Sequence, residues 1–468
     1  MMKLNYRAVT AAFAGAALCS CAVGPDYHRP AFETTPNYKE SADWKPTEPN
    51  DILSRGPWWK IYNDDALNSL EDQVNISNEN IKAAAAAFEQ SRALVAQARA
   101  GLWPSIAAFF QATRGAQAGL PTSRTTYNAG VSGSWDLDIW GGIRRTVESD
   151  RASAQASSAA LAAARLSAQS EVALDYFELR AADQNQKLLD NTVDAETQSL
   201  KITESRYKFG VAARADVVSA EAQLLSSQAE QVNAKIQRAV LEHAIAVLIG
   251  RQPATFSLAV EPIRTDVPTV PAGVPSTLLE RRPDVAQAER KMAAANAQIG
   301  VAKAAYFPSL TLAAQDEYAG SSIGHLIQAS NRIWSFGPEL AETLFDAGLR
   351  RAQVAQARAA YDISVDNYRQ TVLSAFEQVE DDVVTLRVLE QQSVIEDAAV
   401  KAAREAEALT LNQYKAGTVP YSSVITAQTT RFAAEETALA VLSSRLQGSV
   451  NLIEALGGGW DQSMATDK

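Results

Sequence analysis

Sulfur and imidazole side chains are scarce in this sequence. Its 468 residues include two cysteines, Cys19 and Cys21, and three histidines, His28, His243 and His325. No histidine, cysteine or carboxylate cluster has the spacing of a metal site, and no glycine-rich phosphate loop is present. We therefore expect no resident metal, no cofactor and no enzymatic activity.

A basic surplus and a long apolar run are missing as well. The formal net charge is −11, which gives no electrostatic reason to expect nucleic acid as a partner. Beyond the N-terminus no run of about 18 apolar residues occurs, so the sequence predicts no transmembrane helix. Membrane-spanning β-strands stay open as an interpretation, because each such strand carries only a weak signal.

One motif is typical of hydrolases. Gly320-Ser321-Ser322-Ile323-Gly324 fits the G-x-S-x-G pattern, which in those enzymes lies on a strand-to-helix elbow. Here the motif falls between two predicted strands, and His325 is adjacent instead of far downstream. We interpret the motif as a glycine-rich surface turn.

The N-terminus has the pattern of a bacterial lipoprotein signal. Two basic residues precede an apolar run that ends in Leu18-Cys19-Ser20-Cys21, which resembles the lipobox. Cleavage would remove a signal peptide of residues 1–20 and leave Cys21 as the lipid attachment site. In lipoproteins of this kind, Ala22 at the second position implies sorting to the outer membrane. An ordinary signal peptide with an incidental cysteine is the less favoured interpretation.

Two strand-like stretches each run directly into a long helical pattern. Apolar and polar residues alternate from Tyr127 to Ile139 and again from Trp334 to Leu344. After a glycine-containing turn, strong helix formers predict helices from about Ile143 to Arg206 and from about Leu349 to Tyr414. The period changes from two to that of a helix in both places, so a strand feeds a very long helix twice.

Each half supplies a second strand and a returning helix. One strand pattern follows Pro104 and another runs from Pro308 to Tyr318, and each forms a hairpin with the alternating stretch of its own half. Returning helices extend to about Ile249 and Leu456, and a further helical pattern covers about Asp65 to Gly101. The expected chain therefore has four strands.

The two halves match at three anchors in the same order. Gly142-Ile143-Arg144-Arg145 matches Gly348-Leu349-Arg350-Arg351, ARAGLWPSI from Ala98 matches AKAAYFPSL from Ala302, and RYKFG ending at Gly210 matches QYKAG ending at Gly417. Their nearly constant spacing predicts an internal tandem duplication. The expected divisions are a lipidated tether (21–65), repeat one (66–250), a proline-rich linker (251–276), repeat two (277–457) and a C-terminal tail (458–468).

Four strands are too few to close a barrel, and open strand edges are not viable in lipid. Two copies would give eight strands with a filled interior, whereas three would give twelve, an even number within the range of outer-membrane barrels. The polar strand faces would then line water with four acidic residues, Asp136, Asp138, Glu317 and Glu339. The alanine-rich helices alone would also fit a soluble coiled-coil rod.

Several motifs together carry a family resemblance. GPDYHRP from Gly24, PWWKIYNDDAL from Pro57, LLERRPDVAQAE from Leu278 and the terminal ALGGGW look like those of the TolC-like outer-membrane efflux factors, in their NodT-type lipoprotein branch. The resemblance implies an α+β membrane protein: a homotrimer with a 12-stranded β-barrel in outer-membrane lipid and a long α-helical coiled-coil barrel in the periplasm.

That resemblance also implies partners and a function. The partners are a periplasmic adaptor and a proton-driven pump of the inner membrane, and the chain would be a passive exit duct for small toxic compounds or drugs. Protein export uses the same duct architecture and is the first alternative. A structural envelope lipoprotein without transport is the second, although the alternating acidic and apolar strands count against it.

The family pattern assigns roles to residues near the two glycine turns. Gly210-Val211-Ala212 and Gly417-Thr418-Val419 match the periplasmic tips that meet the adaptor.

The same pattern pairs a tyrosine with an aspartate to hold the closed duct shut, and the matching residues are Tyr414 and Asp216. A simple helix cap is the alternative role of Asp216. An acidic constriction is frequent in the family, but the matching positions here are Ser423 and Thr426, which leaves a carboxylate ring without support.

Overall fold

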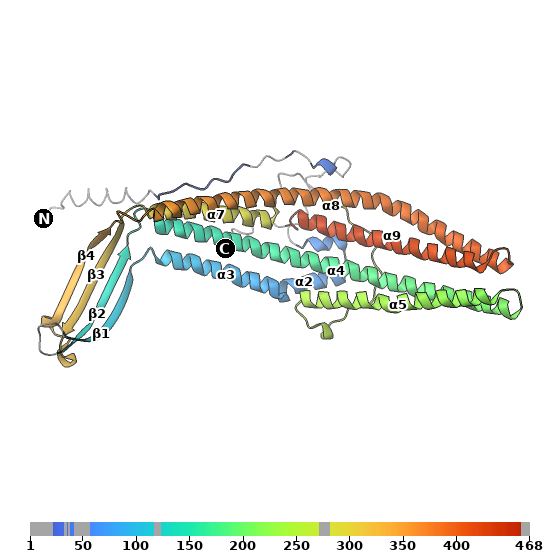
Figure 1. The fold of residues 1–468 in the computed structure, drawn as a ribbon, viewed down its shortest axis with the longest axis horizontal. Coiled ribbons are helices and arrows are strands. Elements are labelled where there is room, and N and C mark those ends of the chain that lie inside the picture. The colour runs from blue at the N-terminus through green and yellow to red at the C-terminus, as the bar shows by residue number, and fades with distance from the viewer. Residues whose placement is uncertain are drawn as a thin grey trace. The chain divides into compact units, whose positions relative to one another are not determined.

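The computed structural model describes residues 22–31, 35, 38–41, 57–116, 123–270 and 281–459. The predicted signal peptide and Cys21 lie outside these residues, as does most of the predicted C-terminal tail. None of the described helices is both long and apolar enough to cross a membrane. Helices and strands follow the same order twice along the described chain (Figure 1).

In each half, helical segments lead to a β-hairpin, a long helix and a returning helix. The first half has α2 Asp65–Ser77, α3 Glu79–Ala100, β1 Ser105–Gly115, β2 Arg124–Asp136, α4 Gly142–Lys208 and α5 Arg214–Leu248. The second half has α7 Pro283–Ala304, β3 Ser309–Gly320, β4 Arg332–Ala341, α8 Leu349–Ala416 and α9 Tyr421–Ala455. Short 3-10 turns lie at Lys39–Ser41, Trp58–Tyr62, Pro253–Thr255, Ile323–His325 and Ala329–Asn331. The four predicted strands and the two long helix pairs are confirmed.

One predicted helix is in fact two. The pattern from Asp65 to Gly101 is interrupted at Asn78, which has extended backbone angles. The side-chain oxygen of Asn78 accepts a hydrogen bond from the backbone of Ile81 (3.0 Å), and its amide donates to the carbonyl of Leu248 (2.7 Å). Asn78 therefore ends α2 and caps α3, because asparagine satisfies the free amides of a helix start well.

Two strands are shorter than their alternating patterns. β2 ends before Ile139, where a main-chain hydrogen bond from Ile139 to Leu137 (2.8 Å) turns the chain toward α4. β4 ends before Leu344, because its partner β3 begins at Ser309, which pairs with Ala341. Alternation predicts the faces of a strand, but its end is set by where the partner strand stops.

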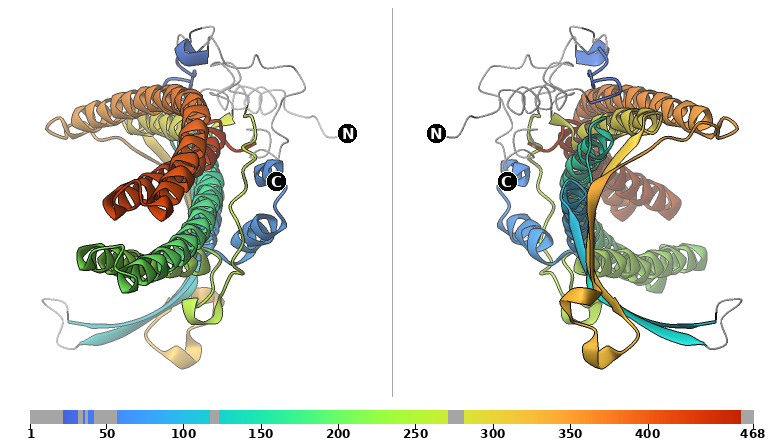
Figure 2. Two further views of the ribbon diagram at one scale, coloured as in Figure 1. Left: turned by 90° about the vertical axis from the view of Figure 1, so that its right-hand side faces the viewer. Right: turned by 90° about the vertical axis from the view of Figure 1, so that its left-hand side faces the viewer.

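Two compact units share these elements. The first consists of the described residues up to 31 with Ala86–Ser158 and Gln287–Gln370, and it contains the sheet. The second contains α2, α5, α9 and the remaining parts of α4 and α8. In the first unit the four strands form one curved, twisted antiparallel sheet (Figure 2).

An aromatic core anchors the second unit. Trp58 and Trp59 are buried, and the ring of Tyr62 lies 4.8 Å from that of Phe177 in α4. The hydroxyl groups of Tyr62 and Ser449 in α9 share a hydrogen bond of 2.7 Å. The buried tryptophans and Tyr62 thus hold the segment before α2 to the helices.

Candidate functional site

The sheet has the strand order β1-β2-β3-β4, with every neighbouring pair antiparallel. β1 and β4 are its edges. Residues directly opposite each other on neighbouring strands share a face of the sheet, because side chains alternate along each strand. The register therefore decides which of the predicted acidic residues lie together.

Three of the four acidic residues expected to line water share one face. Thr311 of β3 pairs with Asp136 of β2 on one side and with Glu339 of β4 on the other. The Thr311 hydroxyl donates to the Asp136 carboxylate (2.7 Å). Glu317 pairs with Gly130 and lies on the same face, farther along the strands. The sheet thus has one polar, acidic face.

The fourth residue, Asp138, was assigned wrongly. It lies after the end of β2, its side chain is 11% exposed, and its carboxylate accepts hydrogen bonds from the backbone amides of Ile143 (2.9 Å) and Arg144 (2.8 Å). Asp138 therefore caps α4, where a carboxylate is favoured by the free amides and the helix dipole. Asp346 caps α8 in the second half in the same manner, with an ion pair to Arg350 (2.7 Å).

The opposite face of the sheet is apolar and exposed. Its large side chains include Ile106, Phe110, Trp334, Phe336 and Leu340, which are between 59 and 80% exposed. A contiguous apolar face of this kind is unusual on a chain that stays in water. The face requires lipid or another apolar surface against it.

One ion pair interrupts that apolar face. Asp316 of β3 pairs across the sheet with Val131 and Trp334, and its carboxylate accepts two hydrogen bonds from the guanidinium of Arg332 (2.9 and 2.8 Å). This ion pair was not predicted, although Asp316 occupies an apolar position of the alternating pattern. Two opposite charges joined in a fork leave little net charge on the face.

Aromatic residues gather where the strands meet the helices of the first unit. Trp103 and Phe345 are exposed, while the rings of Trp140 and Phe307 stack with their centroids 4.6 Å apart. The Arg350 guanidinium lies over the ring of Tyr306. Indole and phenol rings are enriched at membrane–water interfaces, so these positions fit an aromatic belt.

The two predicted tips are helix-ending turns in the second unit. Gly210 and Gly417 have φ values of +73° and +82°, and each donates its amide to a carbonyl of the preceding turn at 2.9 Å. Glycine is favoured there because a side chain would strain this left-handed conformation. Val211, which follows the first glycine, is exposed. The turns are confirmed, and contact with an adaptor stays a prediction.

The expected hydrogen bond between Tyr414 and Asp216 is wrong for this structure. The hydroxyl of buried Tyr414 donates to the hydroxyl of Thr203 (3.3 Å), and the Asp216 carboxylate accepts from the backbone amide of Ala213 (3.3 Å). Within the described residues, Asp216 acts as the cap of α5, as the alternative interpretation had it. A helix start leaves backbone amides without a partner inside the helix, and the carboxylate accepts a hydrogen bond from one of them.

Another contact joins the helix pair α4–α5 to the helix pair α8–α9 near their tips. The guanidinium of Arg206 in α4 lies 4.8 Å above the ring of Tyr414 and donates to the carbonyl of Lys415 at the end of α8 (2.8 Å). A cation is favoured at the carbonyl end of a helix, and stacking on an aromatic ring adds to the attraction. Sequence reasoning did not find Arg206, because the matching position of the second half is Gln413.

The two candidate constriction positions carry no charge and no common contact. Thr426 is exposed on α9, and its hydroxyl donates to the carbonyl of Ser422 one turn earlier (3.1 Å). Ser423 is half-buried in the first turn of the same helix. Their role as a constriction stays a prediction.

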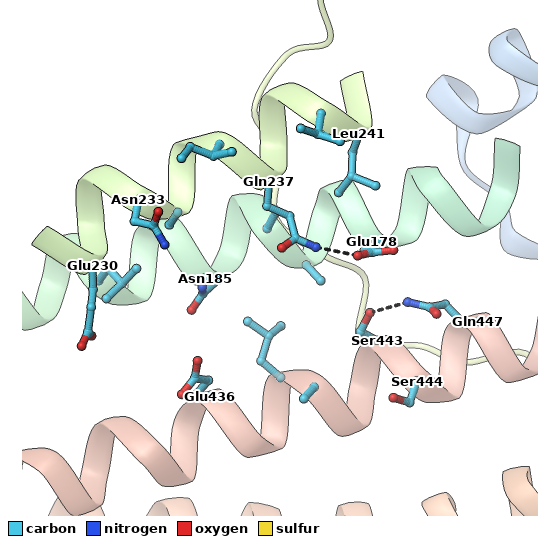
Figure 3. A pocket seen from close by; sticks show the side chains of 18 of the residues that line it. Glu178, Asn185, Glu230, Asn233, Gln237, Leu241, Glu436, Ser443, Ser444 and Gln447 are labelled. Carbon is cyan, nitrogen blue, oxygen red and sulfur yellow. Dashed lines mark hydrogen bonds between the residues drawn. The ribbon is translucent and has the colours of Figure 1, made fainter. Parts of the chain in front are cut away.

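A cleft of about 1080 Å³ lies between α4, α5 and α9 of the second unit. Glu230 and Glu436 project into it from α5 and α9 (Figure 3). Gln237 donates to the Glu178 carboxylate on its wall (2.6 Å). The sequence does not predict this cleft, because it requires the relative placement of three helices.

Several carboxyl groups of the second unit are held in a low-polarity environment. Burial raises the pKa of Asp382 to about 7 and that of Asp175 to about 6, and neighbouring carboxylates add to both effects. Burial also holds the pKa of Glu71 well above its usual range, and neither oxygen of Glu71 has a hydrogen-bond partner among the described residues. These groups keep protons at pH values where exposed carboxyls lose them.

The chain resembles known proteins along almost its whole length. A family model described as "Outer membrane efflux protein" matches residues 70–251 and 274–458. The probable efflux pump outer membrane protein TtgC of Pseudomonas putida is 29% identical over 465 residues, covering 97% of this chain and 95% of that protein. The probable outer membrane lipoprotein SilC of Salmonella typhimurium is 27% identical, covering 98% and 100%. Among solved structures, the outer-membrane channel OprN has a TM-score of 0.87 at 28% identity, covering 94% of this chain and 100% of that one.

Proposed function

The chain belongs to the outer membrane efflux protein family, and from this premise we propose that it is the passive exit duct of a tripartite efflux system. The protein is an outer-membrane channel component of efflux pumps, and its role is transport without catalysis. The observation that carries the proposal is the sheet, which has an exposed apolar face and an acidic polar face. One face fits lipid and the other fits water.

Three copies form the duct in this proposal. Within one chain β1 and β4 are free edges, and free edges are not viable in lipid. Pairing β1 of one copy with β4 of the next closes a 12-stranded barrel, with Asp136, Glu317 and Glu339 toward the water-filled interior. Cys21 carries the lipid that adds a second attachment to the outer membrane.

The helices supply a second surface for the same assembly. An exposed apolar stripe runs along α5, at spacings of four and seven residues, and its members are between 48 and 64% exposed: Val218, Leu225, Val232, Ile236, Val240 and Val247. This is the spacing of a coiled-coil seam. We propose that a helix of the neighbouring copy covers the stripe, so that the helices form a periplasmic barrel continuous with the duct.

A periplasmic adaptor and a proton-driven inner-membrane pump complete the system in the proposal. The exposed tips at Gly210 and Gly417 are the surfaces for the adaptor. Energy enters at the pump, and the duct itself supplies none.

The proposed cargo is small toxic compounds or drugs. Loss of the protein should then sensitise cells to such compounds and leave the set of secreted proteins unchanged. Protein export is the second candidate, and the opposite pattern of losses would favour it.

Reconstitution of the purified full-length chain in planar bilayers tests the duct itself. We expect discrete conductance steps, and we expect the Cys21→Ala variant to leave membranes only with detergent. A chain that gives no channels, and that becomes soluble after Cys21→Ala, is a tethered structural lipoprotein and contradicts the duct.

A further inference from the structure

The described N-terminal residues 22–31, here called the strap, are bound closely to the first unit. Arg145, in the first turn of α4, is 5% exposed. Its guanidinium donates to the carbonyls of Val23 (3.3 Å) and Gly24 (3.5 Å) and to the carboxylate of Asp26 (2.9 Å). One buried cation therefore binds three residues of the strap.

Helix α7 holds the next part of the strap. Asn296 donates its side-chain amide to the carbonyl of Pro25 (3.1 Å). The hydroxyl of Tyr27 donates to the buried carboxylate of Glu289 (2.5 Å). Hydrogen bonds to a charged acceptor are among the stronger ones in proteins, so α7 adds a second firm attachment of the strap at Tyr27.

Close backbone packing fixes the path of the strap. Gly24 has a φ of +117°, and a side-chain carbon there would lie 2.5 Å from the Cα of Gly300 in α7. Gly141 has a φ of +78°, and a side-chain carbon there would lie 2.7 Å from the Cβ of Ala22. No residue other than glycine fits either crossing without a shift of the backbone.

The second copy of the sequence pattern offers an internal comparison. Gly300 corresponds to Ala96 in the first half, and Arg145 corresponds to Arg351 in the second half. Arg351 is exposed, whereas Arg145 is buried under the strap. Gly300 and Arg145 are thus the members of these two matched pairs that contact the strap.

The strap starts where the strands of the sheet meet the helices of the first unit. The amide of Val23 donates to the carbonyl of Trp140 (3.0 Å), whose ring stacks on Phe307. The indole nitrogen of Trp140 donates to the carbonyl of Pro308, directly before β3 (2.8 Å). Ala22 therefore lies beside an aromatic pair of the kind found at membrane interfaces, and Cys21 is its neighbour in the sequence.

We propose that the strap sets the depth of the lipid anchor. Arg145 and the glycine crossings hold Ala22, the residue after the attachment site, at the level of Trp140 and Phe307. The acyl chains and the apolar face of the sheet would then enter one bilayer at matching heights. A free tether of ten residues would let the attachment site wander over about 17 Å, more than half the thickness of the hydrocarbon core. Arg145 thus positions the lipid anchor relative to the bilayer. This inference rests on the proposed acylation of Cys21.

A nitroxide label on Val23→Cys in the full-length chain, reconstituted in vesicles of phosphatidylethanolamine and phosphatidylglycerol, measures the strap directly. Acylation blocks Cys21, so the introduced thiol is the one that reacts. We expect an immobilised spectrum and a label depth at the interface. Arg145→Met should make the label mobile, and Arg151→Met, which removes an exposed arginine of the same helix, should leave it immobile. A mobile label in the native background, or an immobile one after Arg145→Met, overturns the strap.

Two further measurements separate this inference from the proposed function. Palmitate incorporation reports acylation, and the heat-resistant oligomer in outer membranes reports insertion. We expect Arg145→Met to keep palmitate incorporation and to lose about tenfold in oligomer, with Arg151→Met unchanged. An unchanged oligomer yield in Arg145→Met overturns the depth-setting role. Absence of palmitate in the native protein refutes acylation at Cys21 and overturns the depth-setting role with it, whereas conductance steps in planar bilayers would still support the proposed duct.

Discussion

An arginine on the apolar face of the sheet should prevent stable insertion, while an arginine on the other face should be tolerated. Ala314 and Ala313 form a matched pair for this test, because both are exposed and adjacent in the inner strand β3. Ala314 pairs with Gly133 and Phe336 on the apolar face. Val131, on the same face, is a poorer choice, since an arginine there would lie opposite Asp316 and pair with it.

The expected magnitude follows from the position in the strand. Ala314 is five residues from the start of β3 and six from its end, which places it about 17 to 20 Å along the strand from either end. At the bilayer midplane an arginine facing lipid costs about 2 to 4 kcal/mol per chain. Three copies in one barrel multiply this cost, so Ala314→Arg should leave almost no assembled oligomer.

The assay is the yield of heat-resistant oligomer in outer membranes, with total protein measured alongside. Ala313→Arg should retain most of the native yield, because its row partners on the polar face are Ser134 and Gly337. Equal losses from both variants would refute the assigned faces. Loss from Ala313→Arg alone would reverse them.

Three other outcomes are expected. Burial raises the pKa of Asp382 to about 7, so the folded chain keeps a proton that the unfolded chain loses near pH 4. The free energy of unfolding should therefore fall as pH rises from about 4 to 7, and Asp382→Asn should remove about 1 to 2 kcal/mol of this fall in thermal unfolding scans. An unchanged pH dependence in the variant would show that Asp382 is not buried in solution. Valine at Gly210 or Gly417 should strain the turn by about 1 to 2 kcal/mol and abolish export while the oligomer persists, and normal export would argue against adaptor contact. Asp216→Ala should lower stability by about 0.5 to 2 kcal/mol as a lost cap, and Tyr414→Phe should leave single-channel conductance unchanged; a raised conductance in both variants would restore their direct pairing.

Local sequence patterns predicted much of the secondary structure of this protein. The change from a period of two to a helical period located each strand and each long helix, because side-chain direction depends only on neighbouring backbone angles. Gly210 and Gly417 were found as helix-ending turns for a similar reason, since glycine adopts a positive φ without strain. Asp136, Glu317 and Glu339 share a face because alternation fixes a face within each strand and antiparallel pairing preserves it.

The tertiary structure decided the partners of polar side chains. Asp138 follows the alternating pattern but caps α4, and Asp216 caps α5 without reaching Tyr414. In both cases the carboxylate accepts from backbone amides at a helix start, instead of facing water or binding the tyrosine that the pattern predicted. Asp316 of β3 and Arg332 of the neighbouring strand β4 likewise form an ion pair, on a face that alternation predicts to be apolar.

The sequence by itself determined the order, type and approximate ends of the elements, because these depend on residues that are close along the chain. Only the tertiary structure decided that Arg145 binds the strap and that three helices surround a cleft. Residues more than a hundred positions apart meet there, and no short pattern records which distant surface a side chain will reach.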